Sequence, residues 1–153
     1  MIEKVINDIN YRLDEENLTA EVIAKRNGYE GDIIIPETVV LKKVAYRVTS
    51  IGECAFDCCF SLTSIVIPDS VTSIGPTAFS SCSSLTSMVI PDSVTSIGEK
   101  AFEFCTSLTS IVIPDSVTSI GEKAFDCCSR LPPLLSPIVS RVLGRGLSNL
   151  AEI

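Results

Sequence analysis

Cysteine is the residue type in this chain whose spacing most suggests a chemical site. Four cysteines recur every 23 residues, at Cys59, Cys82, Cys105 and Cys128. Such a ladder could serve as a metal or redox site. Zinc, however, needs ligands that converge on one point, whereas these four lie in a line, and the chain contains no histidine to complete a site. We therefore expect the four cysteines to be small buried residues, one at a tight corner of each repeat.

Three further cysteines, Cys54, Cys58 and Cys127, depart from this spacing. Two of them form sequence neighbours with ladder cysteines, in Cys58–Cys59 and Cys127–Cys128. In each such pair we expect one thiol to face outward, where a reagent can reach it. Because the total is odd, at least one thiol stays free unless two chains pair. The cysteines therefore leave the redox compartment undetermined.

Aspartate forms a second ladder, with Asp69, Asp92 and Asp115 each placed in a Pro-Asp-Ser sequence. A column of carboxylates could attract calcium, which requires several oxygens around one ion. Each repeat supplies only one such carboxylate, so the pattern favours a structural role. We expect each Asp to accept hydrogen bonds from nearby backbone amides and to fix the turn after proline.

The remaining polar residues do not form a catalytic arrangement. Serine and threonine are abundant, but without histidine the Ser-His-Asp mechanism is closed. Lys100 and Lys123 directly follow Glu99 and Glu122, and we interpret these residues as solvated surface charges. Glycines recur singly before turns and do not form a phosphate-binding loop. The sequence thus predicts a protein that is not an enzyme and needs no metal or other cofactor.

These residues are positioned by three nearly identical segments that follow one another without gaps. They cover residues 62–84, 85–107 and 108–130, and the last two copies differ at five positions. Strict repetition at this period indicates a solenoid, in which each copy is one coil stacked on its neighbour. We predict an α/β-type, mostly β, right-handed coil stack.

The pattern inside one copy predicts which side chains form the core. Ile65 and Ile67 alternate along a short strand that Pro68 ends, and Val71 and Ile74 form a second inward run. Residues 76–79 then predict a short helical turn. Its phenylalanine recurs in every copy, and we expect Phe56, Phe79, Phe102 and Phe125 to stack as a ladder.

The outward positions of the repeated strand are the candidate contact surface. They alternate with the inward isoleucines and are Ser64, Val66, Ser87, Val89, Ser110 and Val112. Together they predict a flat row of small, partly apolar groups across the sheet, where solenoids usually bind partners. The alternative is an ordinary β-face built of good strand formers.

The segments on either side of the three copies differ from them. Residues 1–32 predict a β-hairpin, turning at residues 15–17, that caps the first coil. Residues 33–61 read as a divergent first repeat, with an insertion at roughly 40–47. Without a capping coil, the strand Ile111–Ile113 should expose its edge, and we expect self-association or fraying at the C-terminal end.

The tail, residues 131–153, abandons the repeat motif. Its residues can be encoded so that the neighbouring reading frame spells the repeat, and our hypothesis is that the tail is the next repeat translated out of frame. The alternative is an amphipathic helix that begins at Ser136–Pro137. On the frameshift hypothesis, this chain is a truncated product of a longer repeat protein.

Composition excludes several partners. The formal net charge of −7 argues against nucleic acid, because phosphate binding needs clustered lysine and arginine. Apolar residues come in runs too short to span a bilayer. The first residues lack the apolar core of a signal peptide, which leaves a cytoplasmic location open.

The repeat motif Leu-x-x-Ile-x-Ile-Pro-x-Ser-Val-Thr-x-Ile-Gly-x-x-Ala-Phe-x-x-Cys resembles the BspA-like, or Treponema-type, leucine-rich repeat of bacterial surface proteins. The resemblance covers residues 48–130 closely and 33–47 loosely, and residues 11–39 look like the cap that precedes such repeats. The family supplies no catalytic residues to carry over.

The resemblance implies a cell-surface or secreted protein with an adhesin-like function, which binds protein or glycan partners through the solenoid surface. One alternative is an intracellular scaffold that uses the same surface for protein interactions. The other is a truncated product without a function of its own.

Overall fold

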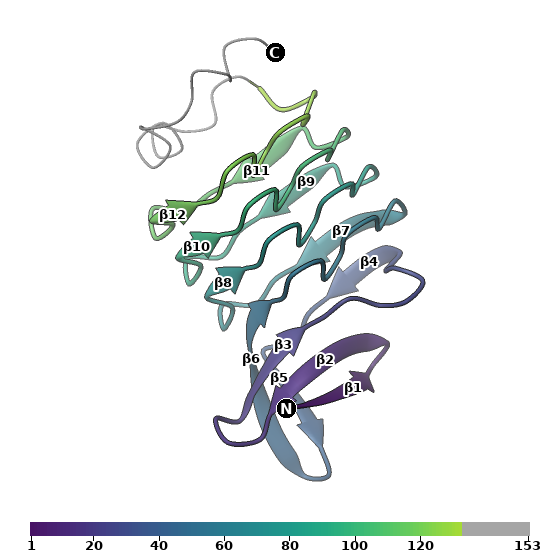
Figure 1. Ribbon diagram of the computed structural model, residues 1–153, viewed down its shortest axis with the longest axis vertical. Helices are drawn as coiled ribbons and strands as arrows, with labels where there is room; N and C mark the ends of the chain where they lie inside the picture. Colours follow the sequence, from purple (N-terminus) through teal and green to yellow (C-terminus); the bar gives the residue numbers. More distant parts are fainter. Residues whose placement is uncertain (133–153) are drawn as a thin grey trace.

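The computed structural model describes residues 1–132, which form a stack of β-strands and turns (Figure 1). The strands are β1 (Ile2–Ile6), β2 (Ile9–Asp14), β3 (Thr19–Val22), β4 (Gly31–Ile34), β5 (Thr38–Leu41), β6 (Val44–Ile51), β7 (Leu62–Val66), β8 (Ser73–Ile74), β9 (Ser87–Val89), β10 (Ser96–Ile97), β11 (Ser110–Val112) and β12 (Ser119–Ile120). From residue 133 on, the tail lies outside the described residues, and with it both hypotheses about the tail.

The first three strands form an antiparallel unit, with one strand more than the expected hairpin. The extra turn lies at Asn7–Asp8, whose φ values of 49° and 63° are those of a two-residue type I′ turn. Asn and Asp tolerate this conformation. The turn therefore divides residues 2–14, whose composition alone indicates one strand, into β1 and β2. β3 then runs parallel to β6, which joins this unit to the stack. Its role as a cap stays a prediction.

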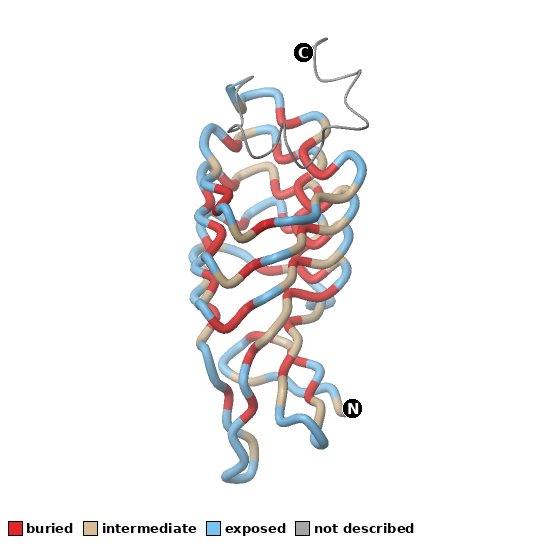
Figure 2. The backbone as a smooth tube through the Cα atoms, turned by 90° about the vertical axis from the view of Figure 1, so that its left-hand side faces the viewer, coloured by how far each residue is buried: buried red, intermediate tan, exposed pale blue. Residues whose placement is uncertain are grey.

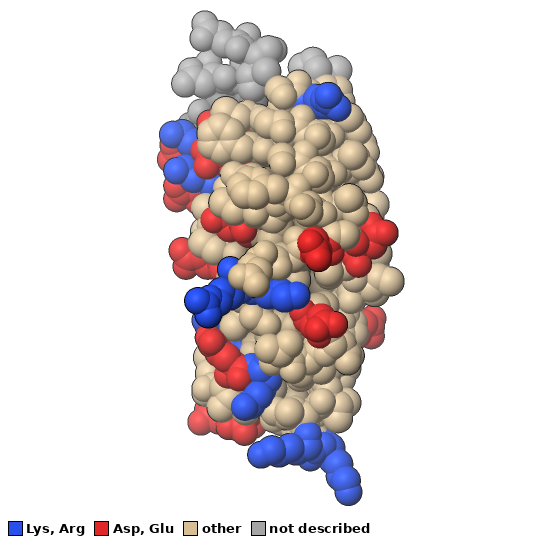
Figure 3. Space-filling view, turned by 90° about the vertical axis from the view of Figure 1, so that its right-hand side faces the viewer, with Lys and Arg blue, Asp and Glu red and all other residues tan. Residues whose placement is uncertain are grey.

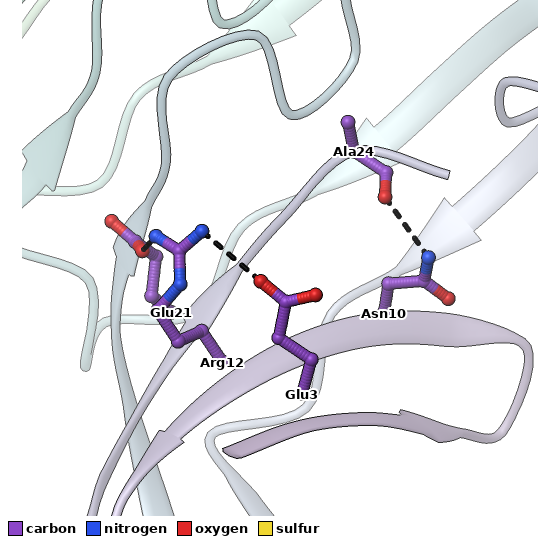
Figure 4. A network of polar contacts seen from close by, with 5 residues as sticks. All are labelled: Glu3, Asn10, Arg12, Glu21 and Ala24. Carbon is purple, nitrogen blue, oxygen red and sulfur yellow. Dashed lines mark hydrogen bonds and ion pairs between the residues drawn. The ribbon is translucent and has the colours of Figure 1, made fainter. Parts of the chain in front are cut away.

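A small ionic network lies on the surface of this unit (Figure 4). The guanidinium group of Arg12 on β2 contacts Glu21 on β3 at 2.7 Å and Glu3 on β1 at 3.2 Å. Beside it, the side-chain amide of Asn10 donates a hydrogen bond of 2.9 Å to the carbonyl of Ala24. Because these side chains are exposed, we assign them a minor part in stability.

The insertion in the first repeat is a β-hairpin, β5–β6, which projects at the lower end of Figure 1. Its two-residue turn consists of Lys42 and Lys43, with φ values of 50° and 71°. The second half of β6 returns to the repeat register, because Ser50 and Ile51 pair with Ser73 and Ile74.

We call residues 33–61, 62–84, 85–107 and 108–130 coils 1 to 4. One side of the stack carries β4, β7, β9 and β11, and the other carries the ends of β6, β8, β10 and β12. Strands in successive coils pair in parallel at a separation of 23 residues, as in Ile74 with Ile97. Figure 2 shows the coils stacked on one another, with buried residues recurring at equivalent positions in successive coils. Parallel pairing is confirmed; the handedness of the stack stays a prediction.

The expected helical turn is wrong, and no helix occurs within residues 1–132. The third side of each coil is a series of turns in which two residues have positive φ, for example Thr77 at 49° and Ser81 at 60°. These values turn alternate amides along the stack axis, so that they donate to the next coil. The amides of Phe56, Phe79 and Phe102 each donate a 2.7 Å hydrogen bond, to the carbonyls of Ala78, Ala101 and Ala124 respectively. Bonds between coils therefore replace those that a helix would make within one.

The core is a column of aligned side chains, and its phenylalanine ladder is confirmed. Rings of successive coils stack with centroid distances of 5.0, 5.2 and 5.3 Å and nearly parallel planes, from Phe56 through Phe79 and Phe102 to Phe125. Ile65, Ile67, Val71 and Ile74 are buried beside them, as the pattern predicts. Burying such side chains contributes about 1.5–3 kcal/mol each.

Glycine recurs where two coils approach each other most closely. A Cβ atom on Gly98 would lie 2.4 Å from the nitrogen of Pro76 and 2.5 Å from the carbonyl carbon of Gly75. Both neighbours are backbone atoms, which cannot move aside without disturbing the coil below. The close approach of the backbones therefore requires glycine at this position.

Candidate functional site

The outward residues of β7, β9 and β11 are exposed, as the sequence predicts. We call Ser64, Val66, Ser87, Val89, Ser110 and Val112 the strip. Its three valines are 55%, 65% and 58% exposed, in chain order. More than half of each of these apolar side chains is therefore in contact with solvent.

Strand pairing brings the strip residues of β9 and β11 into register. Ser87 pairs with Ser110 and Val89 with Val112, and β7 lies beside β9. Between these outward positions, Ile65 and Met88 are buried, and Ile111 is partly buried. Alternation along each strand therefore sends one set of side chains to the core and leaves the strip as a continuous surface.

Two residues of β4 extend the strip and were missed in the sequence. Ile34 lies opposite Val66 and is 73% exposed, and Asp32 lies opposite Ser64. The alignment of residues 33–35 with residues 65–67 already contains the signal for Ile34. Asp32 carried no such signal, because the register shifts between Gly31 and Asp32.

Asp32 places a negative charge at the N-terminal end of an otherwise uncharged strip. Its Oδ1 atom accepts hydrogen bonds from Ser64 Oγ at 2.6 Å and Thr63 Oγ1 at 2.8 Å. These two bonds hold the pKa of the Asp32 carboxyl below its ordinary value, and the bond from Ser64 has the larger effect. The strip therefore offers methyl groups, hydroxyl groups and one ionised carboxylate to a partner.

The repeated cysteines lie in the core, so the predicted burial is confirmed. Cys59, Cys82, Cys105 and Cys128 are all buried, and the seven cysteines are free thiols. Each of the last three thiols donates to a phenylalanine carbonyl of the preceding coil, as Cys82 does to Phe56 at 3.2 Å. Burial raises the pKa of the Cys82 thiol, which makes it a poor nucleophile.

The cysteines outside the ladder are more accessible. Cys58 and Cys127 are exposed, which confirms that one thiol of each neighbouring pair faces outward. Cys54 is half-buried, and its Sγ atom lies 3.0 Å from Thr77 Oγ1. Within residues 1–132, no group of three Cys, Asp or Glu side chains is arranged to hold a metal ion.

The aspartate ladder does not act as expected. Asp69, Asp92 and Asp115 are exposed, and their carboxylates accept no hydrogen bond from other residues in the described part of the chain. The turn is closed by the backbone instead, as when the amide of Val71 donates to Pro68. In coils 3 and 4 the serine that follows Asp links the coils, with Ser93 Oγ donating to the Val71 carbonyl at 2.6 Å and Ser116 Oγ to the Val94 carbonyl at 2.9 Å.

The comparisons with known proteins agree with this geometry. The model of the BspA type leucine-rich repeat region matches residues 41–137, and the stacked 23-residue coils lie within that range. The chain belongs to the BspA-type leucine-rich repeat family. No curated protein matches it in sequence.

Solved structures of bacterial leucine-rich repeat proteins resemble the chain. A leucine-rich cell surface protein from Faecalibacterium prausnitzii is 37% identical, with a TM-score of 0.73 over 86% of this chain and 35% of that chain. A leucine-rich repeat protein from Bacteroides ovatus is 39% identical, with a TM-score of 0.73 over 82% of this chain and 33% of that one. The leucine-rich repeat protein of T. pallidum is 25% identical, with a TM-score of 0.66 over 85% of this chain and 69% of its own.

This chain thus spans about a third of the length of the first two relatives. Proteins of the leucine-rich repeat family are generally not catalytic. No helix within residues 1–132 is long and apolar enough to cross a membrane.

Proposed function

We propose that this chain is a non-enzymatic recognition module of the bacterial cell surface, which binds a protein or glycan partner through the strip. The single observation that carries the proposal is the exposed row of Val66, Val89 and Val112 on the neighbouring strands β7, β9 and β11, with Val89 paired to Val112. The surface location is supported by the Faecalibacterium relative, a cell surface protein.

The core holds the strands of the strip rigidly. The inward neighbours of the strip are fixed in the core, so the outward side chains keep their positions when no partner is bound. A partner therefore meets a preordered surface, and little conformational entropy is lost on the side of this chain. Burying several half-exposed valines and Ile34 would contribute on the order of a few kcal/mol.

The test replaces the apolar groups of the strip without touching the core. A variant with Val66→Lys, Val89→Lys and Val112→Lys keeps every inward residue. The matched control carries Thr72→Lys, Thr95→Lys and Thr118→Lys, which adds the same charge at exposed positions at the same repeat spacing on the other side of the coils. Both variants and the parent chain are tested for binding to immobilised collagen, fibronectin and laminin and to a glycan array.

We expect the parent and the control to bind a common target, and the strip variant to bind it at least about tenfold more weakly, because each buried valine contributes about 1.5 kcal/mol or more. Circular dichroism of all three chains verifies that the sheet is retained. Equal binding by the strip variant contradicts the proposal.

A further inference from the structure

The β5–β6 hairpin has a charge opposite to that of the whole molecule. Residues 38–52 contain Lys42, Lys43 and Arg47 and no acidic residue, in a chain of net charge −7. The hairpin is also the place where the first repeat departs from the others. Blue side chains project at the lower end of Figure 3, where Figure 1 places the hairpin. The projection is therefore a local basic site on an acidic protein.

The turn of this hairpin presents two ammonium groups side by side. Lys42 and Lys43 are exposed and occupy both central positions of a type I′ turn, with φ of 50° and 71°. Such turns favour Asn and Gly, which tolerate positive φ. The chain uses Asn7–Asp8 for its other turn of this kind. Two lysines are thus retained where a better turn sequence is available.

The edge of β5 offers unpaired backbone groups next to these charges. The amide of Val48 donates to the carbonyl of Glu37, so the hydrogen-bonded pairs of the hairpin are Glu37 with Val48, Val39 with Tyr46, and Leu41 with Val44. The amide and carbonyl of Val40 therefore point away from β6. Within residues 1–132, β5 pairs with no strand other than β6. Val40 is also 59% exposed.

We propose that the β5 edge is a docking site for an acidic peptide segment of a partner protein in extended conformation. The segment pairs its backbone with Val40, and its carboxylates meet Lys42 and Lys43. A peptide fits because only a peptide has donors and acceptors at the spacing of a strand edge. Acidic side chains of the segment fit because they complement the charge of Lys42 and Lys43. An apolar side chain between two acidic residues of the segment would cover Val40. The site is separate from the strip and does not depend on the proposed function.

A rival explanation makes opposite predictions. Proteins often place lysine near exposed strand edges to prevent pairing with other chains. In that case Lys42 and Lys43 repel partners, and an acidic peptide does not add to β5. The experiment must therefore separate strand pairing from simple charge attraction.

The probe is a peptide of alternating glutamate and valine, acetylated and amidated at its ends, carrying a fluorophore for anisotropy at low ionic strength. Three comparison probes are used with the full chain. The first is the same peptide with N-methylated valines, which cannot donate backbone hydrogen bonds from those positions. The second is a peptide of alternating lysine and valine. The third is a sulfated polysaccharide.

Two variants remove the lysines. Lys42→Glu with Lys43→Glu reverses the charge, and Lys42→Asn with Lys43→Gly removes it while improving the turn, so that loss of binding cannot arise from unfolding. The matched control is Lys100→Glu with Lys123→Glu, which makes the same charge change at two other residues with positive φ.

We expect the glutamate–valine peptide to bind the parent chain and the control. Its affinity should fall at least about tenfold with either hairpin variant and with N-methylation, because backbone pairing and charge both contribute. The lysine–valine peptide should not bind. The proposal is overturned if the peptide fails to bind the parent chain, if N-methylation leaves the affinity unchanged, or if the control variant loses as much as the hairpin variants. Binding of the sulfated polysaccharide as tightly as the peptide would also overturn it, since charge alone would then suffice.

Discussion

The ring of Tyr29 lies 4.7 Å from the ring of Phe56, tilted by 42°. It ends the phenylalanine column, whose other members are stacked within 6° of parallel. The Tyr29 hydroxyl accepts a hydrogen bond from the amide of Asn10 and donates one to the carbonyl of Ile23, each at 2.9 Å. One side chain therefore ties the N-terminal strands to the core of the repeats.

Two substitutions of Tyr29 distinguish the contribution of its ring to stability from that of its hydroxyl. We expect Tyr29→Ala to lower the free energy of unfolding by about 3–5 kcal/mol, because it removes a buried ring from the end of the column. Tyr29→Phe keeps the ring and should cost only about 0.5–1.5 kcal/mol for the lost hydrogen bonds. Urea unfolding of the two variants measures the difference. Equal losses would mean that the contact with Phe56 contributes little.

Ser70 and Ser93 occupy equivalent positions in coils 2 and 3 but have different partners. Ser93 Oγ donates to Val71, whereas Ser70 Oγ is buried without a partner in residues 1–132, above the coil that carries the inserted hairpin. We expect Ser93→Ala to destabilise the protein by about 1 kcal/mol, since it leaves a carbonyl unpaired. Ser70→Ala should be neutral or stabilising. Thermal unfolding of both variants under the same conditions tests this order, and its reversal would contradict the hydrogen-bond assignment.

The contact between successive glycines predicts a severe effect from one added methyl group. Gly98→Ala would place Cβ within 2.5 Å of backbone atoms of the neighbouring coil. We expect a loss of more than about 2 kcal/mol in unfolding free energy, because the coils must move apart. Glu99→Ala, at the exposed adjacent position, should change it by less than about 0.5 kcal/mol. A mild effect of Gly98→Ala would show that the coils can separate at little cost.

Thiol accessibility should divide the cysteines into two classes. With Ellman's reagent at mildly alkaline pH, we expect Cys58 and Cys127 to react in the folded protein, because they are exposed. The four ladder cysteines should react only on unfolding, since they are buried and burial raises the pKa of the Cys82 thiol. A variant with Cys58→Ser and Cys127→Ser should lose the fast reaction. Fast labelling of ladder cysteines would contradict the packed core.

The lysine turn predicts a gain in stability on substitution. Lys42→Asn with Lys43→Gly places residues that favour positive φ at both positions. We expect an increase of about 1 kcal/mol in unfolding free energy, because strain in the turn is relieved. Differential scanning calorimetry measures it, with Lys42→Gln and Lys43→Gln as the control, which removes the same two charges without introducing residues that favour positive φ. An unchanged or lower melting temperature would argue against strain at this turn.

The sequence predicts the core well because each copy repeats it. Phe79 and Phe102 occur in the same sequence context, so they must occupy the same surroundings, and stacking follows. The strip follows from alternation along a strand. The prediction of a helical turn at residues 76–79 was wrong because the local conformational preference of a segment does not report hydrogen bonds to the next coil. The amide of Phe79 finds its acceptor on Ala101, 22 residues ahead.

Features outside the repeat were harder to predict. Nothing in the composition of residues 40–47 places Lys42 and Lys43 at the tip of a hairpin, because lysine is a poor former of such turns. Asp32 became part of the candidate site through a register shift that pairing with β7 decides. The lysine turn and the position of Asp32 both depend on contacts between segments that occur once in the chain, so no second copy helps to predict them.

The aligned amide bonds along the turns give the molecule a direction. Along the turns the lower coil donates and the upper coil accepts, and the amides of Lys123 and Phe125 find no acceptor within residues 1–132. If two molecules aligned these turns at the same end, they would oppose donor to donor, so that arrangement is disfavoured. The turns therefore distinguish the two ends of the stack, because only a segment that presents carbonyl groups can pair with the amides of the last turn.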